Sequence, residues 1–338
     1  MSRVAVIGAG SWGTALSMVL ADNGYQVNLY SRRKEQVEEI NYKRSNAKYL
    51  PNVHLPEGIT ASSSWGHVLD NAQYVLIVLP TVAIRAALKE MSPYLESPKL
   101  FIHSSKGLEP HTHKRISEII AEEVPVDKRR GILVLSGPSH AEEVSRRAPA
   151  SVAVAGENLE QAEEVQNLFF NPYFRVYTNT DVIGVELGGA LKNIIALGAG
   201  LSDGLGFGDN AKAALMTRGL AEMTRLGVEL GAHPLTFSGL TGLGDLIVTC
   251  TSRHSRNWRC GYALGQGEPL ERVLNKMGMV VEGVRTTEVA FQIAQQKGVE
   301  MPITRELYYV LFKGKSPFQA VNDLMQRGRR HEWEMNLY

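Results

Sequence analysis

A glycine-rich turn near the N-terminus constrains this chain more than any other feature. Gly8-Ala9-Gly10-Ser11-Trp12-Gly13 follows the apolar run Val4–Ile7 and precedes a helical stretch over residues 14–22. A G-x-G-x-x-G spacing in this strand–turn–helix setting predicts dinucleotide binding. Gly8 would permit the tight turn, Gly10 would let the backbone approach the pyrophosphate, and Gly13 would let the helix pack on the strand. One alternative is a glycine turn with a purely structural role, and another is that the largely apolar residues 4–21 form a signal peptide. The glycine spacing favours a dinucleotide-binding turn over both.

The composition is that of an ordinary globular protein, long enough for two domains. The 338 residues are 44% hydrophobic, and 36 Lys and Arg against 35 Asp and Glu leave a formal net charge of +1. This balance argues against binding to nucleic acid or to a membrane surface. Two cysteines, Cys250 and Cys260, are too few for a disulfide framework, so we expect a reduced, cytoplasmic protein. Outside residues 4–21 no apolar run approaches the ~20 residues that span a bilayer, so we expect no stable membrane anchor.

A change of hydrophobic period divides the chain. Up to about residue 180, short apolar runs alternate with helical patterns, which predicts parallel βαβ units. The continuous run Tyr74–Leu79 is typical of a central strand covered on both faces. We therefore expect an α/β, Rossmann-like doubly wound sheet domain over residues 1–184. The predicted strands are Val4–Ile7, Val27–Tyr30, Tyr74–Leu79, Leu100–Ser104, Ile132–Ser136, Ser151–Ala155 and Arg175–Tyr177.

Beyond about Gly184 the pattern becomes helical. One apolar face runs through residues 187–198, and a second long helical segment covers residues 211–231. Pro302 is placed to open a helix, and Gly298 and Gly314 are placed to end one. These signals predict an all-α domain over residues 185–338. The basic run at residues 327–331 is interpreted as a solvated end.

Two arginines follow the second predicted strand. NAD-specific folds usually place an acidic residue there to accept from the ribose 2′-hydroxyl. This chain has Ser31-Arg32-Arg33 instead. Because a guanidinium pair suits a 2′-phosphate, we expect NADP(H) to be preferred, with NAD(H) also usable. The alternative is that these arginines only form a solvated helix start.

Small polar and basic residues follow two later strands. These segments are Ser104-Ser105-Lys106-Gly107 and Ser136-Gly137-Pro138-Ser139-His140-Ala141. Ligands bind beyond the carboxyl ends of parallel strands, so Lys106 could reach a bound anion or carbonyl there. Gly137, Ser139 and Ala141 would lie beside a nicotinamide. Taken singly, each of these residues could equally belong to an ordinary loop.

The helical half holds one lysine in an apolar, glycine-rich segment. Lys192 stands there, and a lysine desolvated in such a setting has a lowered pKa and is a candidate proton-transfer group. A surface lysine extending from a helix is the commoner case. Asp245 and Thr249 are four residues apart and would share a helix face. Ser255-Arg256-Asn257 could grip a phosphate or form a solvated loop.

Taken together, these motifs resemble those of the bacterial sn-glycerol-3-phosphate dehydrogenases that use NAD(P). The resemblance covers essentially the full length and rests, in order, on Gly8-Ala9-Gly10-Ser11-Trp12-Gly13-Thr14, Lys48-Tyr49-Leu50-Pro51, Ser105-Lys106-Gly107, Ser136-Gly137-Pro138-Ser139, Ala190-Leu191-Lys192-Asn193, Gly244-Asp245, Ser255-Arg256-Asn257 and Val281-Glu282-Gly283. It implies a Rossmann-like half followed by a helical half. It also implies reversible reduction of dihydroxyacetone phosphate to sn-glycerol 3-phosphate, which supplies the backbone of glycerophospholipids.

The resemblance further implies roles for individual residues. Lys192 would exchange a proton with the carbonyl oxygen, Lys106 would help to polarise the carbonyl, and Asp245 and Thr249 would orient Lys192. The substrate would contact Lys106, Gly137, Ser139, Lys192, Asp245, Ser255, Arg256 and Asn257, with its phosphate near Arg256. The dinucleotide would contact Gly8, Gly10, Ser11, Trp12, Gly13, Arg32, Arg33, Tyr49, Lys106, Ala141, Arg256, Val280 and Glu282.

Two other functions are compatible with parts of this pattern. A β-hydroxyacid or ketopantoate-type reductase would share the fold and a helix-borne lysine, but its substrate carries a carboxylate. A nucleotide-sensing protein would keep the first domain and would lack one or both lysines, yet both are present. The nine histidines show no HExxH or comparable spacing, so we expect no metal. The sequence leaves the oligomeric state open, a homodimer included.

Overall fold

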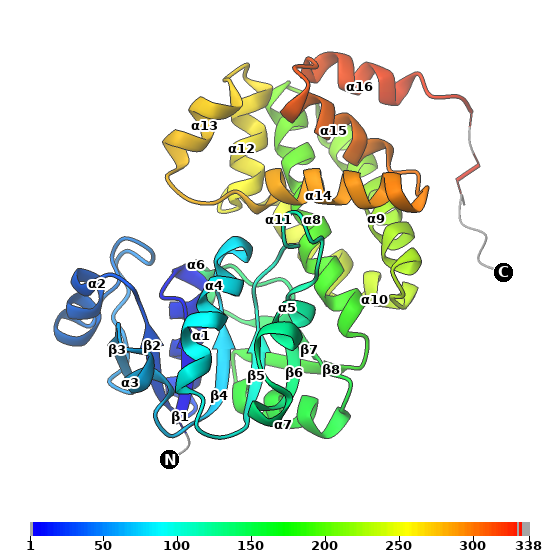
Figure 1. Cartoon of the computed structure of the whole chain (residues 1–338). Helices are drawn as coiled ribbons and strands as arrows, with labels where there is room; N and C mark the ends of the chain where they lie inside the picture. The colour runs from blue at the N-terminus through cyan, green and yellow to red at the C-terminus, as the bar shows by residue number, and fades with distance from the viewer. Residues whose placement is uncertain (1–2, 330, 333–338) are drawn as a thin grey trace. The chain divides into compact units, whose positions relative to one another are not determined.

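Eight strands form one sheet in the order β3-β2-β1-β4-β5-β6-β7-β8 (Figure 1). The computed structural model describes residues 3–329 and 331–332, so that Arg330 of the basic run lies outside the described residues. The strands are β1 Arg3–Ile7, β2 Gln26–Tyr30, β3 Ile59–Ser62, β4 Ala72–Ile77, β5 Lys99–His103, β6 Arg129–Ser136, β7 Ala150–Ala155 and β8 Phe174–Asn179. Together with its helices, this sheet confirms the predicted Rossmann-like fold class.

Two features of the sheet differ from the prediction. The sequence predicted parallel units throughout, whereas β6 and β7 pair antiparallel. The link between them holds only the four-residue helix α6, Ala141–Val144, and therefore no full crossover helix. Strand β3 was not predicted, because it has only four residues, Ile59–Ser62, which is too short a run for a clear alternating pattern.

Helices cover both faces of the sheet because alternate strand residues face opposite sides. In β1, Val4 and Val6 belong to a core with the buried residues of α1, α6 and α7, whereas Ala5 and Ile7 belong to a core with those of α3, α4 and α5. The helices of this part are α1 Ser11–Asp22, α2 Lys34–Glu38, η1 Glu39–Lys43, α3 Trp65–Leu69, α4 Thr81–Met91, η2 Ser92–Tyr94, α5 Ile116–Glu123, η3 Val126–Lys128, α6 Ala141–Val144 and α7 Leu159–Phe169.

Within the described residues the rest of the chain is helical. Its elements are α8 Val182–Gly204, α9 Asp209–Glu229, α10 Pro234–Phe237, η4 Leu240–Gly244, α11 Asp245–Thr251, α12 Arg256–Gly265, α13 Leu270–Met277, α14 Glu282–Lys297, α15 Pro302–Phe312 and α16 Pro317–Met325. The chain divides into two compact units, Met1–Glu186 and Leu187–Tyr338. The helix signals hold, since Pro302 opens α15 and Gly298, in the left-handed conformation, ends α14.

Helix α8 corrects one expectation about apolar runs. Its 23 residues are long and apolar enough to cross a membrane by length and composition, with a mean hydropathy of 1.5 in its most apolar window. No such run was expected outside residues 4–21, because the glycines and the polar residues Glu186, Lys192 and Asn193 interrupt the apolar side chains of this helix. Inside the protein 94% of that window is buried, as in the core helix of a globular unit.

Candidate active site

The glycine turn joins β1 to α1 in a conformation that explains each glycine separately. Gly8 has φ +123°, and a Cβ on it would overlap the carbonyl oxygen of Val78. A Cβ on Gly13 would overlap the carbonyl oxygen of Gly8, so the helix packs on the turn without a side chain between them. A Cβ on Gly10 would meet nothing within 4 Å. Gly10 is also the N-cap of α1 and has no side chain that could cap the helix. The first backbone N–H groups of α1 can therefore bind a diphosphate.

A buried polar network supports this turn from behind. The Nε2 of Gln36 donates to the carbonyl of Ala9 at 2.6 Å and to Oδ1 of Asn46 at 3.0 Å. Asn46 in turn donates to the same carbonyl at 3.1 Å and to the hydroxyl of Thr14 at 2.8 Å. Because buried amides that satisfy one another hold a unique geometry, this network fixes the turn. Sequence reasoning missed Gln36 and Asn46, since neither stands in a recognisable motif.

The arginines after β2 differ in their surroundings. Both are exposed, but Arg33 also donates to Oε1 of Gln36 at 2.8 Å, and its guanidinium carbon lies 5.4 Å from the centre of the Tyr49 ring. The carbonyl of Tyr49 accepts from Ser11 at 2.9 Å. The structure thus brings together Ser11, Arg33 and Tyr49, and Gln36 links Arg33 to the back of the glycine turn.

The carboxyl edge of the sheet gathers the next candidates. Lys106 donates from Nζ to the carbonyl of Gly137 at 3.1 Å, and the Ser139 hydroxyl donates to the same carbonyl at 3.0 Å. Gly137 has φ +149°, and a Cβ there would lie 2.8 Å from Cα of Val152. Ala141, the first residue of α6, is buried. Lys106, Gly137 and Ser139 therefore form one local cluster.

Trp12 has a structural partner in this region. Its indole N–H donates to the Ser104 hydroxyl at 2.8 Å, and that hydroxyl donates to the carbonyl of Leu135 at 2.7 Å. Trp12 thereby ties the start of α1 to the ends of β5 and β6. Sequence reasoning assigned no role to Ser104, because its function becomes visible only when the neighbouring strands are in place.

In the second unit Lys192 is buried with two partners. Its Nζ donates to Oδ1 of Asp245 at 2.5 Å and to the Thr249 hydroxyl at 2.8 Å. Lys192 is 5% exposed and Asp245 1% exposed. Asp245 and Thr249 lie on one face of α11, as their spacing predicted. A buried ammonium is costly unless it is paired, so Asp245 compensates the charge of Lys192 and holds it in place.

Cys250 follows Thr249 in α11 and is fully buried. Burial raises the pKa of its thiol to about 12. The thiolate is the reactive form of cysteine, so this residue is unsuited to nucleophilic chemistry at neutral pH.

An amide chain connects the predicted phosphate triplet to α8 and α14. Asn257 donates from Nδ2 to Oδ1 of Asn193 at 2.8 Å, and its own Oδ1 accepts from the backbone N–H of Gly283 at 2.9 Å. A Cβ on Gly283 would lie 2.5 Å from the carbonyl oxygen of Asn193. Sequence reasoning assigned no role to Asn193 or Gly283, although both stand inside motifs that it identified.

Ser255 and Arg256 lie at the start of α12. The Ser255 hydroxyl oxygen accepts from the backbone N–H of Trp258 at 3.2 Å and so caps the helix. Arg256 is exposed and donates to the carbonyl of Val280 at 3.2 Å. The N-terminus of α12 thus combines a hydroxyl, a guanidinium group and the positive end of a helix dipole, a combination that suits an anion.

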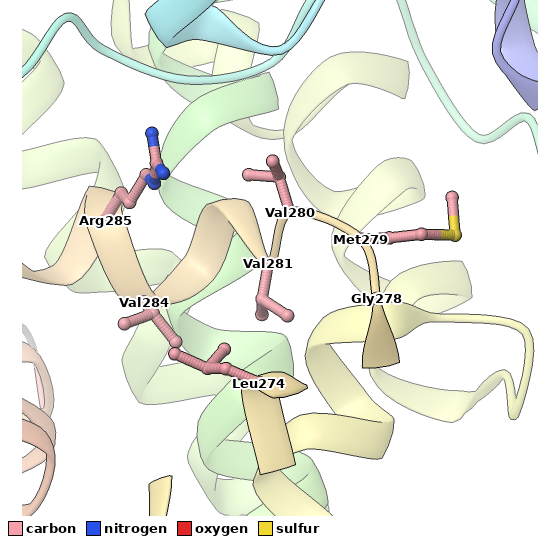
Figure 2. A pocket seen from close by; sticks show the side chains of 7 residues that line it. All are labelled: Leu274, Gly278, Met279, Val280, Val281, Val284 and Arg285. Carbon is pink, nitrogen blue, oxygen red and sulfur yellow. The ribbon is translucent and has the colours of Figure 1, made fainter. Parts of the chain in front are cut away.

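A cavity of about 350 Å³ adjoins the segment that contains Val280 and Val281. It is lined by Leu274, Gly278, Met279, Val280, Val281, Val284 and Arg285. Figure 2 shows Val281 turned towards Leu274 and Val284, whereas Val280 and the Arg285 guanidinium extend to the opposite side. Glu282 opens α14 directly after this segment. The two valines therefore face different surroundings.

The doubly wound sheet with its glycine turn, followed by a helical unit that buries a paired lysine, is typical of dinucleotide-dependent dehydrogenases. Comparison with known proteins narrows this class. Residues 3–162 match the model of the NAD-dependent glycerol-3-phosphate dehydrogenase N-terminus, and residues 181–322 match that of the C-terminus. The glycerol-3-phosphate dehydrogenase [NAD(P)+] of Bacillus anthracis is 60% identical over 99% of this chain and 98% of its own length. The chain belongs to the NAD-dependent glycerol-3-phosphate dehydrogenase family.

Solved structures agree with this assignment. A glycerol-3-phosphate dehydrogenase from Coxiella burnetii is 39% identical with a TM-score of 0.92, and the match covers 96% of this chain and 99% of that one. A ketopantoate reductase from Ralstonia eutropha is 15% identical with a TM-score of 0.60 over 94% of this chain and 99% of that one. At that identity the second likeness concerns the fold alone. Family membership therefore confirms the predicted enzyme class over the reductase and sensor alternatives.

Proposed function

We propose that this chain catalyses the reversible NAD(P)H-dependent reduction of dihydroxyacetone phosphate to sn-glycerol 3-phosphate, which supplies the backbone of glycerophospholipids. The observation that carries the proposal is the buried pair of Lys192 and Asp245, with Thr249 beside it, in a chain of this family. A carbonyl reduction needs a proton donor for the oxygen, and a paired ammonium is such a donor. The first unit binds the dinucleotide, and the second supplies this donor and the phosphate ligands.

The residues of the first unit fit a dinucleotide. Gly10 leaves space at the N-terminus of α1 for the diphosphate, and Gly8, Ser11, Trp12 and Gly13 shape that turn. Arg32, Arg33 and Tyr49 would receive the adenosine end, and Ala141, Arg256, Val280 and Glu282 complete the proposed cofactor ligands. When bound, the reduced nicotinamide supplies hydride to C2 of the substrate. The arginines support a preference for NADP(H), since guanidinium groups bind phosphate well.

The protein residues then handle charge and protons. As the carbonyl carbon gains hydride, negative charge builds on its oxygen, and Lys192 donates a proton to that oxygen. Asp245 and Thr249 keep the Lys192 ammonium directed during this step. Lys106, held at the carbonyl of Gly137 beside Ser139, helps to polarise the carbonyl. Cationic groups stabilise the developing alkoxide more than the neutral ketone, so both lysines favour the transition state.

The phosphate ligands of this proposal lie at the start of α12. Ser255 accepts its capping bond through its oxygen and keeps its own proton for donation to a phosphate oxygen. Arg256 and the helix N-terminus add positive charge. The side-chain amide of Asn257 donates to Asn193 and accepts from the backbone N–H of Gly283. The main role of Asn257 in binding is therefore to hold Ser255 and Arg256 in place.

The direct test is to mix the protein with dihydroxyacetone phosphate and follow the absorbance of NADPH or NADH. We expect oxidation with either cofactor, and loss of it in the variant Lys192→Met. Ketopantoate and other 2-keto acids serve as parallel substrates, and turnover of these alone would reject the proposal. Bound NADPH without turnover of any substrate would instead indicate a sensor.

The proposal includes a cytoplasmic location and a homodimeric state. Both cysteines are free and buried, which supports a reducing compartment. Analytical ultracentrifugation at micromolar concentration measures the subunit number, and a monomer at all concentrations would contradict the dimer.

A further inference from the structure

A carboxylate near the end of α8 links three helices of the second unit. Oδ2 of Asp203 accepts from the indole N–H of Trp258 on α12 at 2.7 Å and lies 2.8 Å from Nζ of Lys212 on α9. The side chains of Asp203 and Lys212 are only 15% and 21% exposed. Lys212 thus compensates the charge of Asp203, while Asp203 holds Trp258. The proposed mechanism uses none of these three residues.

Helices α8 and α12 also touch through their backbones (Figure 1). A Cβ on Gly200 of α8 would overlap the carbonyl oxygen of Trp258, and one on Gly261 of α12 would overlap that of Leu197. One turn further on, a Cβ on Gly265 would lie 2.5 Å from the carbonyl oxygen of Leu201. This close approach sets the distance between the two helices. The same close packing restricts sliding of one helix along the other, and two polar contacts between the helices restrict it further, because Asn257 donates to Asn193 and Gln266 donates to the carbonyl of Gly204.

The hydrogen bond that the Trp258 indole donates to Asp203 adds a contact with a charged group near the start of α12. Trp258 donates its backbone N–H to Ser255, the residue that caps the helix and precedes Arg256. Trp258 therefore connects the proposed phosphate ligands to Asp203. Helix α8, which carries Asp203, also carries Lys192. The position of the phosphate ligands relative to the proton donor therefore depends on how α12 is held against α8.

We propose that Asp203 and Trp258 are positioning residues for phosphate recognition, which they serve by fixing the register of α12 against α8. This inference rests on the proposed function. It assigns Lys212 the supporting task of compensating the Asp203 charge, so that the site near the phosphate carries no uncompensated carboxylate. The two positioning residues themselves need not touch the substrate.

The experiment compares four proteins with dihydroxyacetone phosphate, with unphosphorylated dihydroxyacetone, and with inorganic phosphate as a competitive inhibitor. Trp258→Phe removes the indole N–H while leaving an aromatic ring to stack on Tyr262. Asp203→Asn keeps an acceptor for Trp258 but loses the ion pair. Tyr262→Phe alters the same helix one turn further on and is the matched control. Thermal unfolding is measured for each.

We expect Trp258→Phe to raise the KM for dihydroxyacetone phosphate and the Ki for phosphate about ten-fold, because displacement of Ser255 and Arg256 would cost about one charge-assisted hydrogen bond to the phosphate. The value of kcat, the KM for NADPH and kcat/KM for dihydroxyacetone should change less than about two-fold. Asp203→Asn should show a smaller effect of the same kind, and Tyr262→Phe none. This pattern separates loss of phosphate recognition from general loss of structure.

Three outcomes would overturn the inference. If the wild-type protein neither reduces dihydroxyacetone phosphate nor is inhibited by phosphate, the proposed function fails and the inference fails with it. If the wild-type protein is active and both variants keep its KM and Ki, only the inference fails. Equal losses with phosphorylated and unphosphorylated substrate would assign Asp203 and Trp258 to general stability instead.

Discussion

Nζ of Lys192 and Oδ1 of Asp245 lie 2.5 Å apart in the buried part of the second unit, with the Thr249 hydroxyl 2.8 Å from the same nitrogen. Neither charge has the option of solvation, since both side chains are almost completely buried. The pair therefore has two roles. Asp245 positions Lys192, the proton donor of the proposed reaction, and the stability of the folded state depends on the presence of both side chains.

Replacing Lys192 by Met separates these two effects. We expect kcat to fall about 10²- to 10⁴-fold, the usual effect of removing a proton-transfer group. The free energy of unfolding should fall by about 3–5 kcal/mol, because the buried Asp245 loses the ammonium of Lys192 as its counter-ion. The double variant Lys192→Met/Asp245→Asn should regain much of the stability and none of the activity. Steady-state kinetics and urea unfolding measure the two quantities, and an active double variant would contradict the role of Lys192.

The arginines after β2 predict a difference between cofactors. Replacing Arg32 and Arg33 by Ala should raise the KM for NADPH roughly 10- to 100-fold, because each charge-assisted bond to the 2′-phosphate contributes about 1.5–3 kcal/mol before solvation losses. The KM for NADH, which lacks that phosphate, should change little. Lys34→Ala, at the next exposed position, serves as the control. Equal effects on the two cofactors would reject the assignment.

The glycines of the turn predict different consequences for the same substitution. Gly10→Ala should leave the protein folded, because its Cβ meets nothing within 4 Å, but should weaken NADPH binding at least about ten-fold. Gly13→Ala should cost about 1–3 kcal/mol of stability or more, because its Cβ overlaps the carbonyl oxygen of Gly8. Fluorescence titration of NADPH and thermal unfolding distinguish these outcomes. Undiminished NADPH affinity in folded Gly10→Ala would argue against the diphosphate position.

Glu186 predicts how the stability of the first unit depends on pH. Burial by itself raises the pKa of this carboxyl, but the contacts with His103, Arg115 and Ser117 outweigh burial and lower the pKa to about 2. Its Oε2 accepts from Arg115 and from the Ser117 hydroxyl, each at 2.6 Å. The stabilisation is thus complete above the ordinary value of 4.5 and is lost as the pH falls from 4.5 towards 2.

The gap between these two pKa values corresponds to roughly 3 kcal/mol. In Glu186→Gln this part of the pH dependence should disappear, and the protein should be less stable at pH 7. Urea unfolding at several pH values between 3 and 7 checks this, with Glu160→Gln on the exposed face of α7 as the control. A variant that keeps the wild-type slope would exclude Glu186 as its source.

Much of the fold could be predicted from local sequence. The strand runs, the glycine turn, the helix signals at Gly298 and Pro302, and the change of period near residue 184 all depend on neighbours within a few positions, and the predicted fold class is confirmed. Strand β3 and the antiparallel pairing of β6 with β7 were not predicted. Both depend on which strand lies alongside, and this choice leaves little trace in so short a segment.

The candidate residues divide in the same way. The spacing of Asp245 and Thr249 predicted a shared helix face, and the motifs pointed to Lys106, Lys192 and Ser255-Arg256-Asn257. The sequence by itself thus determined the class of fold, the family and the chemical groups available, because these depend on residue type and spacing. The resemblance already implied that Asp245 orients Lys192, but only the tertiary structure decided the partners of other groups: Asn193 for Asn257, Gln36 for Arg33, Asp203 for Trp258. A buried polar group must find its partner wherever packing brings one, and that partner is often far away in the chain.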